Sequence, residues 1–190
     1  MNQKKEDRRV RVTKKVISES FIELMQQYPI TKISVKMICE SADINRSTFY
    51  SHYADQYDLL SKIQHEVAGG IKENISPTRF TENNKDAVSV IIRILEYAKE
   101  NAPLFRVLLS EHSNSTFQEE LKYLVREKTL EEMGGDAQLG ASVTKYIELF
   151  AINGILSIIA RWLEDDCADT PEFLANLIMK LIMQGIRSLY

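Results

Sequence analysis

The spacing of apolar residues predicts three short helices before residue 54. The first runs from Arg11 to Tyr28, and Pro29 ends it because proline disfavours helical geometry in the residue before it. The second begins after Ser34, a good N-cap, and the third covers Arg46–Tyr53. The predicted inward positions are Ile17, Phe21, Leu24, Met25 and Tyr28 in the first helix, Val35, Ile38, Cys39 and Ala42 in the second, and Phe49 and Tyr53 in the third.

A tight turn separates the second and third of these helices. Asp43-Ile44-Asn45 interrupts the apolar period, and Asp and Asn tolerate the left-handed backbone that such a turn needs. Asn45 is also a good N-cap for the third helix. A helix, a three-residue turn and a helix with a polar and aromatic outer face form the helix-turn-helix pattern, whose second helix enters a DNA major groove.

The apolar period continues through the rest of the chain. A fourth helix over Asp55–Asn74 carries an inward stripe and an internal Gly69-Gly70 pair, which permits a bend or a close helix crossing. Pro77–Lys85 is the best candidate linker. Further helices are predicted over Ala87–Ala102, Leu104–Leu109, Ser115–Met133 (inward Phe117, Leu121, Leu124 and Val125) and Ala137–Leu163, and from an N-cap at Thr170 with Pro171 at the first helical position.

The last two predicted helices are apolar enough to suggest burial against a second copy of the chain. The apolar run Leu149–Ala160 has 12 residues, too short for the ~20 that a bilayer requires, so we expect no membrane association. Candidate dimerisation residues are Ile155, Ile159, Leu174, Leu177, Ile178, Leu181 and Gly185.

These elements predict an all-α protein of about nine helices. Residues 1–54 would form a three-helix helix-turn-helix DNA-binding domain with a basic N-terminal segment. Residues 55–190 would form a helical regulatory and dimerisation bundle.

Charge is distributed unevenly in a way that supports DNA binding at one end. The net charge of −3 argues against a nucleic-acid partner, but residues 1–65 hold 11 Lys/Arg against 8 Asp/Glu, while residues 66–190 hold 13 against 19. Seven of the basic residues lie in the first 15. This segment can track phosphates as a flexible arm, or it can be a solvated tail.

Composition points to a cytoplasmic protein without catalytic chemistry. The first twelve residues lack an apolar stretch, so we expect no secretory signal. Cys39 falls on an apolar helix face, and its distance in sequence from Cys167 favours free thiols over a disulfide. The three His and two Cys form no metal-ligand spacing, and neither a phosphate-binding glycine loop nor a G-x-S-x-G motif is present, so we expect no metal, no cofactor and no enzyme.

Residues 10–62 resemble the DNA-binding domain of the TetR/AcrR family of transcriptional regulators. The resemblance rests on Ile33-Ser34-Val35, Ile38, Ile44, the run Ser47-Thr48-Phe49-Tyr50, His52-Tyr53 and Leu59-Leu60. It implies an all-helical homodimer with an N-terminal DNA reader, a variable C-terminal ligand domain and a fourth helix that transmits ligand state.

The resemblance also assigns DNA-contacting positions. Arg46, Ser47 and Tyr50 would face the groove, and Arg46 is the strongest candidate for base readout because a guanidinium binds guanine O6 and N7 together. The alternative for Arg46 is a phosphate contact, and His52 could be a surface residue without a partner. The complete DNA-binding set is Ser34, Lys36, Arg46, Ser47, Thr48, Tyr50, Ser51, His52 and Gln56.

Two positions depart from the family pattern. Asp43 stands where the turn usually has Gly, and Gln56 stands where a phosphate-binding Lys is common. Asp55 is a good N-cap for the fourth helix, whose first N–H groups could still hold a phosphate.

The C-terminal region leaves two functions open. Tyr97, Phe105, His112, Tyr123, Tyr146, Phe150 and Trp162 could line a cavity for a small hydrophobic effector, or they could be core and interface residues. The favoured hypothesis is a ligand-responsive repressor that binds a pseudo-palindromic double-stranded DNA operator as a homodimer. The alternative is an activator or a protein-partner adaptor without a small-molecule inducer.

Overall fold

The protein is built from helices that form a small N-terminal body and a larger C-terminal body. The computed structural model describes residues 2–75, 84–110, 117, 119, 121, 123 and 141–187, and its described part contains eight α-helices. They are α1 (Asn2–Met25), α2 (Val35–Ser41), α3 (Arg46–Tyr50), α4 (Gln56–Ile75), α5 (Asn84–Glu100), α6 (Ala102–Leu109), α8 (Ala141–Glu164) and α9 (Pro171–Arg187), with a 3-10 turn, η1, at Ile30–Lys32. The all-α prediction is confirmed, and the predicted number of helices is close.

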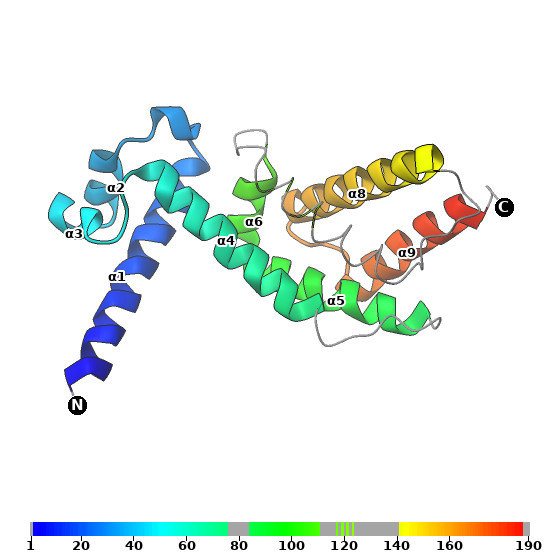
Figure 1. Ribbon diagram of the computed structural model, residues 1–190, viewed down its shortest axis with the longest axis horizontal. Helices are drawn as coiled ribbons and strands as arrows, with labels where there is room; N and C mark the ends of the chain where they lie inside the picture. The colour runs from blue at the N-terminus through cyan, green and yellow to red at the C-terminus, as the bar shows by residue number, and fades with distance from the viewer. Residues whose placement is uncertain are drawn as a thin grey trace.

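The two bodies lie at opposite ends of α4 (Figure 1). Helices α2 and α3 sit at one end with the C-terminal half of α1, while α8 and α9 sit at the other. One continuous cluster of buried side chains extends from Ile17 and Phe21 in α1 through Leu59 and Val67 in α4 to Ile178 in α9. The bodies therefore share a core, and α4 is the helix common to both.

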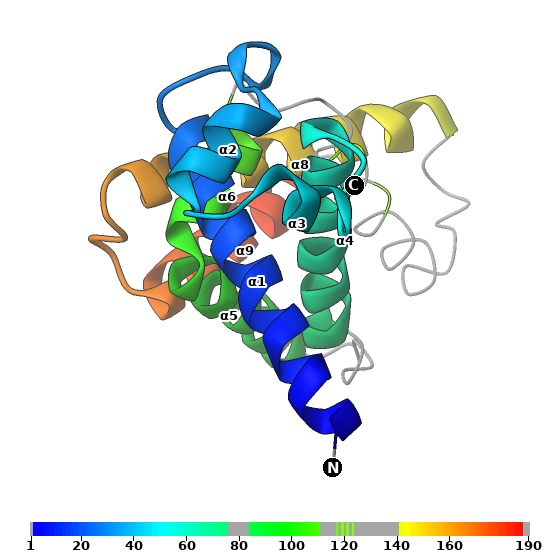
Figure 2. The ribbon, with the colours of Figure 1, turned by 90° about the vertical axis from the view of Figure 1, so that its left-hand side faces the viewer.

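The basic N-terminal segment is helical, which corrects the predicted start of the first helix at Arg11. Its backbone is α-helical from Asn2, because Lys, Arg and Glu favour helix and no Gly or Pro interrupts them. The segment projects beyond the rest of the molecule in two perpendicular views (Figures 1 and 2). Arg8, Arg9 and Arg11 are exposed along it.

The first helix also ends earlier than predicted. It stops at Met25, and the amide of Tyr28 donates to the carbonyl of Leu24 (2.9 Å) in the turn that follows. Tyr28 was expected inside but is exposed, because the chain has already left the helix. Ile17, Phe21 and Met25 are buried as predicted, and Leu24 is half-buried.

Helix α4 makes a close contact with α5 at the second glycine of its Gly69-Gly70 pair. A Cβ atom added at Gly70 would overlap the hydroxyl of Tyr97 and lie 2.7 Å from its Cζ, whereas one at Gly69 would meet nothing within 4 Å. The Tyr97 ring meets Phe105 of α6 edge to face, with ring centroids 5.7 Å apart. Arg93 of α5 also donates from Nη2 to the carbonyl of Asn74 (3.2 Å), near the end of α4. The glycine pair thus permits a close helix crossing, one of the two predicted roles.

The end of α8 is fixed by hydrogen bonds from α6 and from its own loop. Arg106 donates from Nε to the carbonyl of Leu163 (2.7 Å) and from Nη2 to Asp166 Oδ1 (2.6 Å). Asp166 and Cys167 then adopt left-handed backbone geometry, with φ of 53° and 54°. The bond to Leu163 thus satisfies one of the carbonyls that a helix end leaves without helical partners.

The start of α9 follows the prediction. Thr170 Oγ1 accepts from the amide of Phe173 (3.2 Å), and Pro171 is the first helical residue.

The apolar part of α8 is longer than the sequence suggested. Lys145–Glu164 is a 20-residue stretch with a mean hydropathy of 1.4, which by length and composition alone could cross a membrane. The prediction that the apolar run is too short to span a bilayer was therefore wrong. Trp162 and Leu163 are nevertheless buried against the rest of the chain, and Trp162 Nε1 donates to the carbonyl of Asp169 (2.9 Å). That end of α8 is a packed element of the C-terminal body.

Several predicted elements lie wholly or partly outside the described residues. Most of the Pro77–Lys85 linker does, although α5 already begins at Asn84. Only four residues of the predicted Ser115–Met133 helix are described; all four are helical, and Phe117 and Leu121 are buried as expected. Leu124, Val125 and His112 lie outside.

Candidate nucleic-acid interface

Local hydrogen bonds shape the turn between α2 and α3. Ser34 caps α2 by accepting from the amide of Met37 (3.3 Å), as predicted. Asp43 adopts φ of 50°, the left-handed geometry expected of it, and the amide of Ile44 donates to the carbonyl of Cys39 (3.0 Å). Helix α3 therefore leaves the turn at a fixed angle to α2.

The third helix is shorter than the predicted Arg46–Tyr53. It ends at Tyr50, and the amide of His52 donates to the carbonyl of Phe49 (2.9 Å), three residues back. Asn45 occupies the N-cap position, but within the described residues its side chain makes no capping hydrogen bond. Its carbonyl accepts from the amides of Thr48 and Phe49 instead. Phe49 and Tyr53 are buried as predicted.

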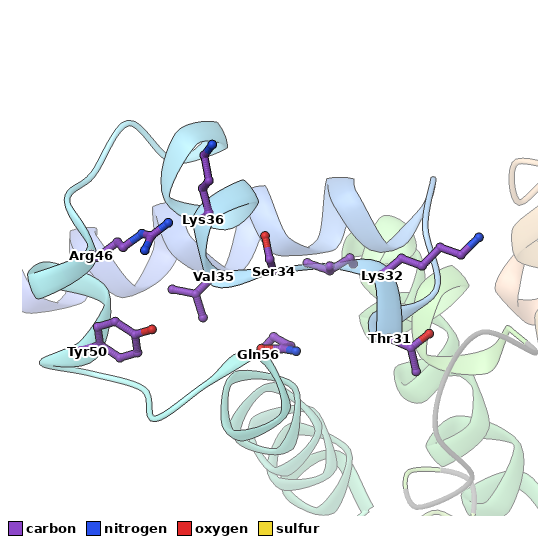
Figure 3. Close-up of a pocket in the computed structure, with 9 residues that line it drawn as sticks. Thr31, Lys32, Ser34, Val35, Lys36, Arg46, Tyr50 and Gln56 are labelled. Carbon is purple, nitrogen blue, oxygen red and sulfur yellow. The ribbon is translucent and has the colours of Figure 1, made fainter.

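An open groove of about 430 Å³ lies where α2, α3, η1 and the start of α4 meet (Figure 3). It brings together five of the nine predicted DNA-binding residues: Ser34, Lys36, Arg46, Tyr50 and Gln56. The remaining lining residues are Thr31, Lys32, Ile33 and Val35. Helix α3 thus presents its outer face beside a polar, basic concavity that carries no carboxylate among its lining residues.

Arg46 is the cation best placed to reach a base edge. It is exposed at the first turn of α3, and no ion pair binds its guanidinium within the described part of the chain. Lys36 lies across the groove and pairs with Glu40 (3.6 Å), but both side chains are mostly exposed, so the pair is weak. A phosphate can compete for Lys36 at little cost.

Of the two aromatic residues on α3, one is buried and the other is exposed. Phe49 is buried, and Tyr50 meets it edge to face with ring centroids 5.7 Å apart. Tyr50 remains 56% exposed, and it lines the groove (Figure 3). Phe49 therefore supports the Tyr50 ring at the edge of the groove.

The hydroxyl residues are not equally available to a phosphate. Ser51 Oγ donates to the carbonyl of Thr48 (2.7 Å), so in this geometry its hydrogen is already used. Ser34 Oγ acts as an acceptor in its cap and keeps its hydrogen for a phosphate oxygen. Ser47 is exposed, Thr48 and His52 are half-exposed, and the His52 ring lies against Tyr53 with centroids 6.3 Å apart.

The start of α4 differs from the expectation that its backbone amides could hold a phosphate. Asp55 Oδ1 accepts from the amides of Tyr57 (2.8 Å) and Asp58 (2.9 Å), which confirms Asp55 as the N-cap. The same bonds occupy two of the first N–H groups of α4, which a phosphate would otherwise use, and they place a carboxylate beside them. From this helix, only Gln56 lines the groove, and its side chain is a neutral carboxamide.

Sequence reasoning missed three residues that the structure brings to this region. Thr31 and Lys32 line the groove from η1, directly before the Ser34 cap. Lys32 could have been identified from the sequence, because it lies two residues before the predicted N-cap Ser34. Lys62 of α4 reaches the carbonyl of His52 (3.1 Å), a contact ten residues apart that no local pattern indicates.

The two cysteines are free and buried, as expected for Cys39. Burial raises the pKa of the Cys39 thiol, with the nearby charge of Arg46 acting in the opposite direction. Burial likewise raises the pKa of Cys167. Among the described residues, no three His, Cys, Asp or Glu side chains cluster as a metal site would require.

The aromatic residues proposed for an effector cavity do not converge on one site. Tyr97 and Phe105 touch each other at the junction of α4, α5 and α6, and Trp162 is buried near the end of α8. Tyr146 and Phe150 lie on the surface of α8, 67% and 80% exposed, and Tyr123 is also exposed. Among the described members of this set, only Tyr97 and Phe105 therefore remain together as cavity candidates.

The proposed dimerisation residues also separate into two groups. Ile159, Leu174 and Ile178 are buried in the chain's own core, and Ile155 is half-buried. Leu177 and Leu181 are exposed on α9. Gly185 lies near the end of α9.

Comparison with known proteins identifies a family model and a curated relative that match parts of the chain. Residues 85–184, more than half of the chain, match the TetR_C_8 family model, described as the transcriptional regulator C-terminal region. A 64-residue stretch is 39% identical to the HTH-type dhaKLM operon transcriptional activator DhaS of Lactococcus lactis subsp. lactis (strain IL1403), covering 33% of this chain and 34% of DhaS. The match spans about a third of the length of that curated relative.

Solved structures of similar fold cover almost all of the chain. A TetR transcriptional regulator from Streptococcus agalactiae aligns with a TM-score of 0.67 at 20% identity, over 93% of this chain and 97% of that one. The dihydroxyacetone kinase operon activator DhaS aligns with a TM-score of 0.59 at 23% identity, over 93% and 97%. The fatty acid degradation regulator FadR from Bacillus halodurans aligns with a TM-score of 0.66 at 15% identity, over 92% and 96%.

Proposed function

Since the chain belongs to the TetR family of transcriptional regulators, we propose that it binds a pseudo-palindromic DNA operator as a cytoplasmic homodimer. Residues 1–54 form the reader in this proposal, and residues 55–190 form the regulatory and dimerisation domain. Arg46 and Tyr50 read base edges from α3, while Ser34, Lys36 and Gln56 contact phosphates on either side. The observation that carries the proposal is the groove itself, in which an exposed Arg46 and Tyr50 stand among polar and basic residues from three further elements.

An exposed apolar face supports the homodimer. Tyr146, Leu149 and Phe150 of α8 follow helical spacing, as do Phe173, Leu177 and Leu181 of α9, and all six side chains are exposed in the single chain. A second copy would cover these residues and would place two α3 helices for successive major grooves. The dimer proposal therefore keeps Leu177 and Leu181 and replaces the buried Ile159, Leu174 and Ile178 with these exposed residues.

Selection of binding sites from random duplex DNA tests the function. We expect the wild-type protein to enrich a palindrome, and Arg46→Ala to weaken binding to it by about 1–3 kcal/mol and to relax preference at one base pair. Equal losses on selected and random DNA would assign Arg46 to a phosphate contact instead. Failure to enrich any sequence would contradict the proposed function.

The sign of regulation has two candidates. The first candidate is a repressor that a small hydrophobic effector releases from DNA, with α4 transmitting the conformational change to the DNA reader. The similarity to DhaS, which is named an activator, favours activation as the second candidate. Transcription from a promoter that carries the selected site separates them, because a repressor lowers and an activator raises transcript yield.

A further inference from the structure

Lys62 joins α4 to the segment that directly follows α3. From the second turn of α4, its Nζ donates to the carbonyl of His52 (3.1 Å) and to Asp58 Oδ2 (2.8 Å). The same ammonium lies 5.2 Å from the centroid of the Tyr53 ring. Asp58 Oδ2 in turn accepts from the amide of Ala54 (2.9 Å). Three consecutive residues of the α3–α4 connection are thus held by two side chains of α4.

This arrangement acts on the orientation of α3 for two physical reasons. The carbonyl of His52 lies just beyond the last turn of α3, where carbonyls lack helical partners and the helix dipole is negative, so a cation is favourable there. The bonds also constrain direction, because they link the backbone at His52 and Ala54 to points one turn apart on α4. Phe49 and Tyr53 are buried and anchor α3 by apolar packing. Such packing is not directional, so it fixes how closely α3 approaches the core better than it fixes the rotation of α3.

The geometry points to Lys62 as a positioning residue for DNA recognition: with Asp58, it sets the angle at which α4 holds the recognition helix. This inference rests on the proposed function and adds a residue that does not line the groove. Lys62 is about half exposed, so it could instead be a phosphate contact. The two roles differ in salt dependence, because a lysine that neutralises a phosphate contributes about one unit to the slope of log K against log salt.

The test compares Lys62→Met with Lys72→Met. Methionine keeps most of the apolar stem in both variants, and Lys72 is an exposed lysine in the last turn of the same helix, so the two changes remove equal charge. Binding is measured at several salt concentrations on the duplex selected by the wild-type protein and on random duplex. Hydrogen exchange of residues 46–58 is measured on the free protein.

We expect Lys62→Met to lose about 3- to 20-fold in affinity for the selected duplex and less than about 2-fold for random duplex, at an unchanged salt slope. Exchange in residues 46–58 should rise, and Lys62→Arg should restore both properties because a guanidinium can donate to the same carbonyl and carboxylate. Lys72→Met should match the wild type.

Other outcomes overturn the inference. Parallel losses on both duplexes with a slope lower by about one would make Lys62 a phosphate contact. Behaviour equal to that of Lys72→Met would show that the bridge does not orient α3. Failure of the proposed function itself is detected separately, because the wild-type protein would then enrich no sequence before any variant is tested. That result would rule out the positioning role of Lys62 as well.

Discussion

The contact between Gly70 and Tyr97 makes a prediction in which neighbouring glycines respond differently to the same substitution. Replacing glycine by alanine inside a helix stabilises it by about 1 kcal/mol, through backbone entropy and helix propensity. At Gly69 a Cβ meets nothing within 4 Å, so Gly69→Ala should gain this amount. At Gly70 the Cβ would overlap the Tyr97 hydroxyl and lie 2.7 Å from Cζ, so the ring must move.

Moving the Tyr97 ring has a cost that can be assembled from its contacts. The ring would leave its edge-to-face position on Phe105, which is worth about 0.5–1.5 kcal/mol. Overpacking adds a further ~1–3 kcal/mol where the neighbours cannot yield completely. Set against the gain of about 1 kcal/mol, these costs leave Gly70→Ala destabilised by about 0.5–3.5 kcal/mol, which is about 1.5–4.5 kcal/mol below Gly69→Ala.

Urea denaturation followed by circular dichroism measures the difference. Protein concentration must be held constant, because the proposed dimer would contribute to the free energy of unfolding. Tyr97→Leu in the Gly70→Ala background removes the ring, and the double-mutant cycle should then show a favourable interaction between the two changes. If Gly70→Ala stabilises the protein as much as Gly69→Ala does, the ring moves without cost and does not fix α4 against α5.

Three further predictions concern other parts of the fold. Gln64 of α4 is 5% exposed and its Nε2 has no hydrogen-bond partner among the described residues, so Gln64→Met should raise the free energy of unfolding by about 1–2 kcal/mol; a loss would mean that water or another group satisfies the amide. The hydrogen bond from Lys62, followed by the one from the Ala54 amide, lowers the pKa of Asp58 below its ordinary 3.8 in the folded state. Its contribution to stability is therefore present above that value and lost as the pH falls through the lowered pKa, so the stability advantage of wild type over Asp58→Asn should disappear in acid titrations. Leu181→Asp should convert a dimer to a folded monomer by light scattering with an unchanged circular dichroism spectrum, because Leu181 is exposed in the single chain.

Features that depend on residues three or four positions apart could be predicted from the sequence. Ser34, Asp55 and Thr170 cap their helices with their own side chains, and Asp43 takes the left-handed turn geometry that its chemistry allows. Each of these outcomes is decided by the local chain and needs no knowledge of the tertiary fold. The burial of Phe49 could be predicted from helical spacing in the same way.

Features that depend on direction or on distant partners could not be predicted. An apolar period cannot reveal a helix made of charged residues, so the helical start of α1 at Asn2 was missed. Spacing places Phe150 and Trp162 on one helix but does not say that one faces solvent and the other the core. Lys62 looks like any solvated lysine until the fold brings His52 against it.

The position of α4 between two sets of bonds gives the proposed regulation a physical route. At one end Lys62 holds the carbonyl of His52, and at the other Arg93 holds the carbonyl of Asn74 while the Tyr97 ring packs on Gly70. Gln56 lies 14 residues from Gly70, or about 21 Å along a helix that rises 1.5 Å per residue. A tilt of about 5° around Gly70 would move the Gln56 end by roughly 2 Å, more than a hydrogen bond to a base edge tolerates. Because α3 is tied to that end of α4, a small change at the α4–α5 contact is sufficient in principle to alter DNA recognition.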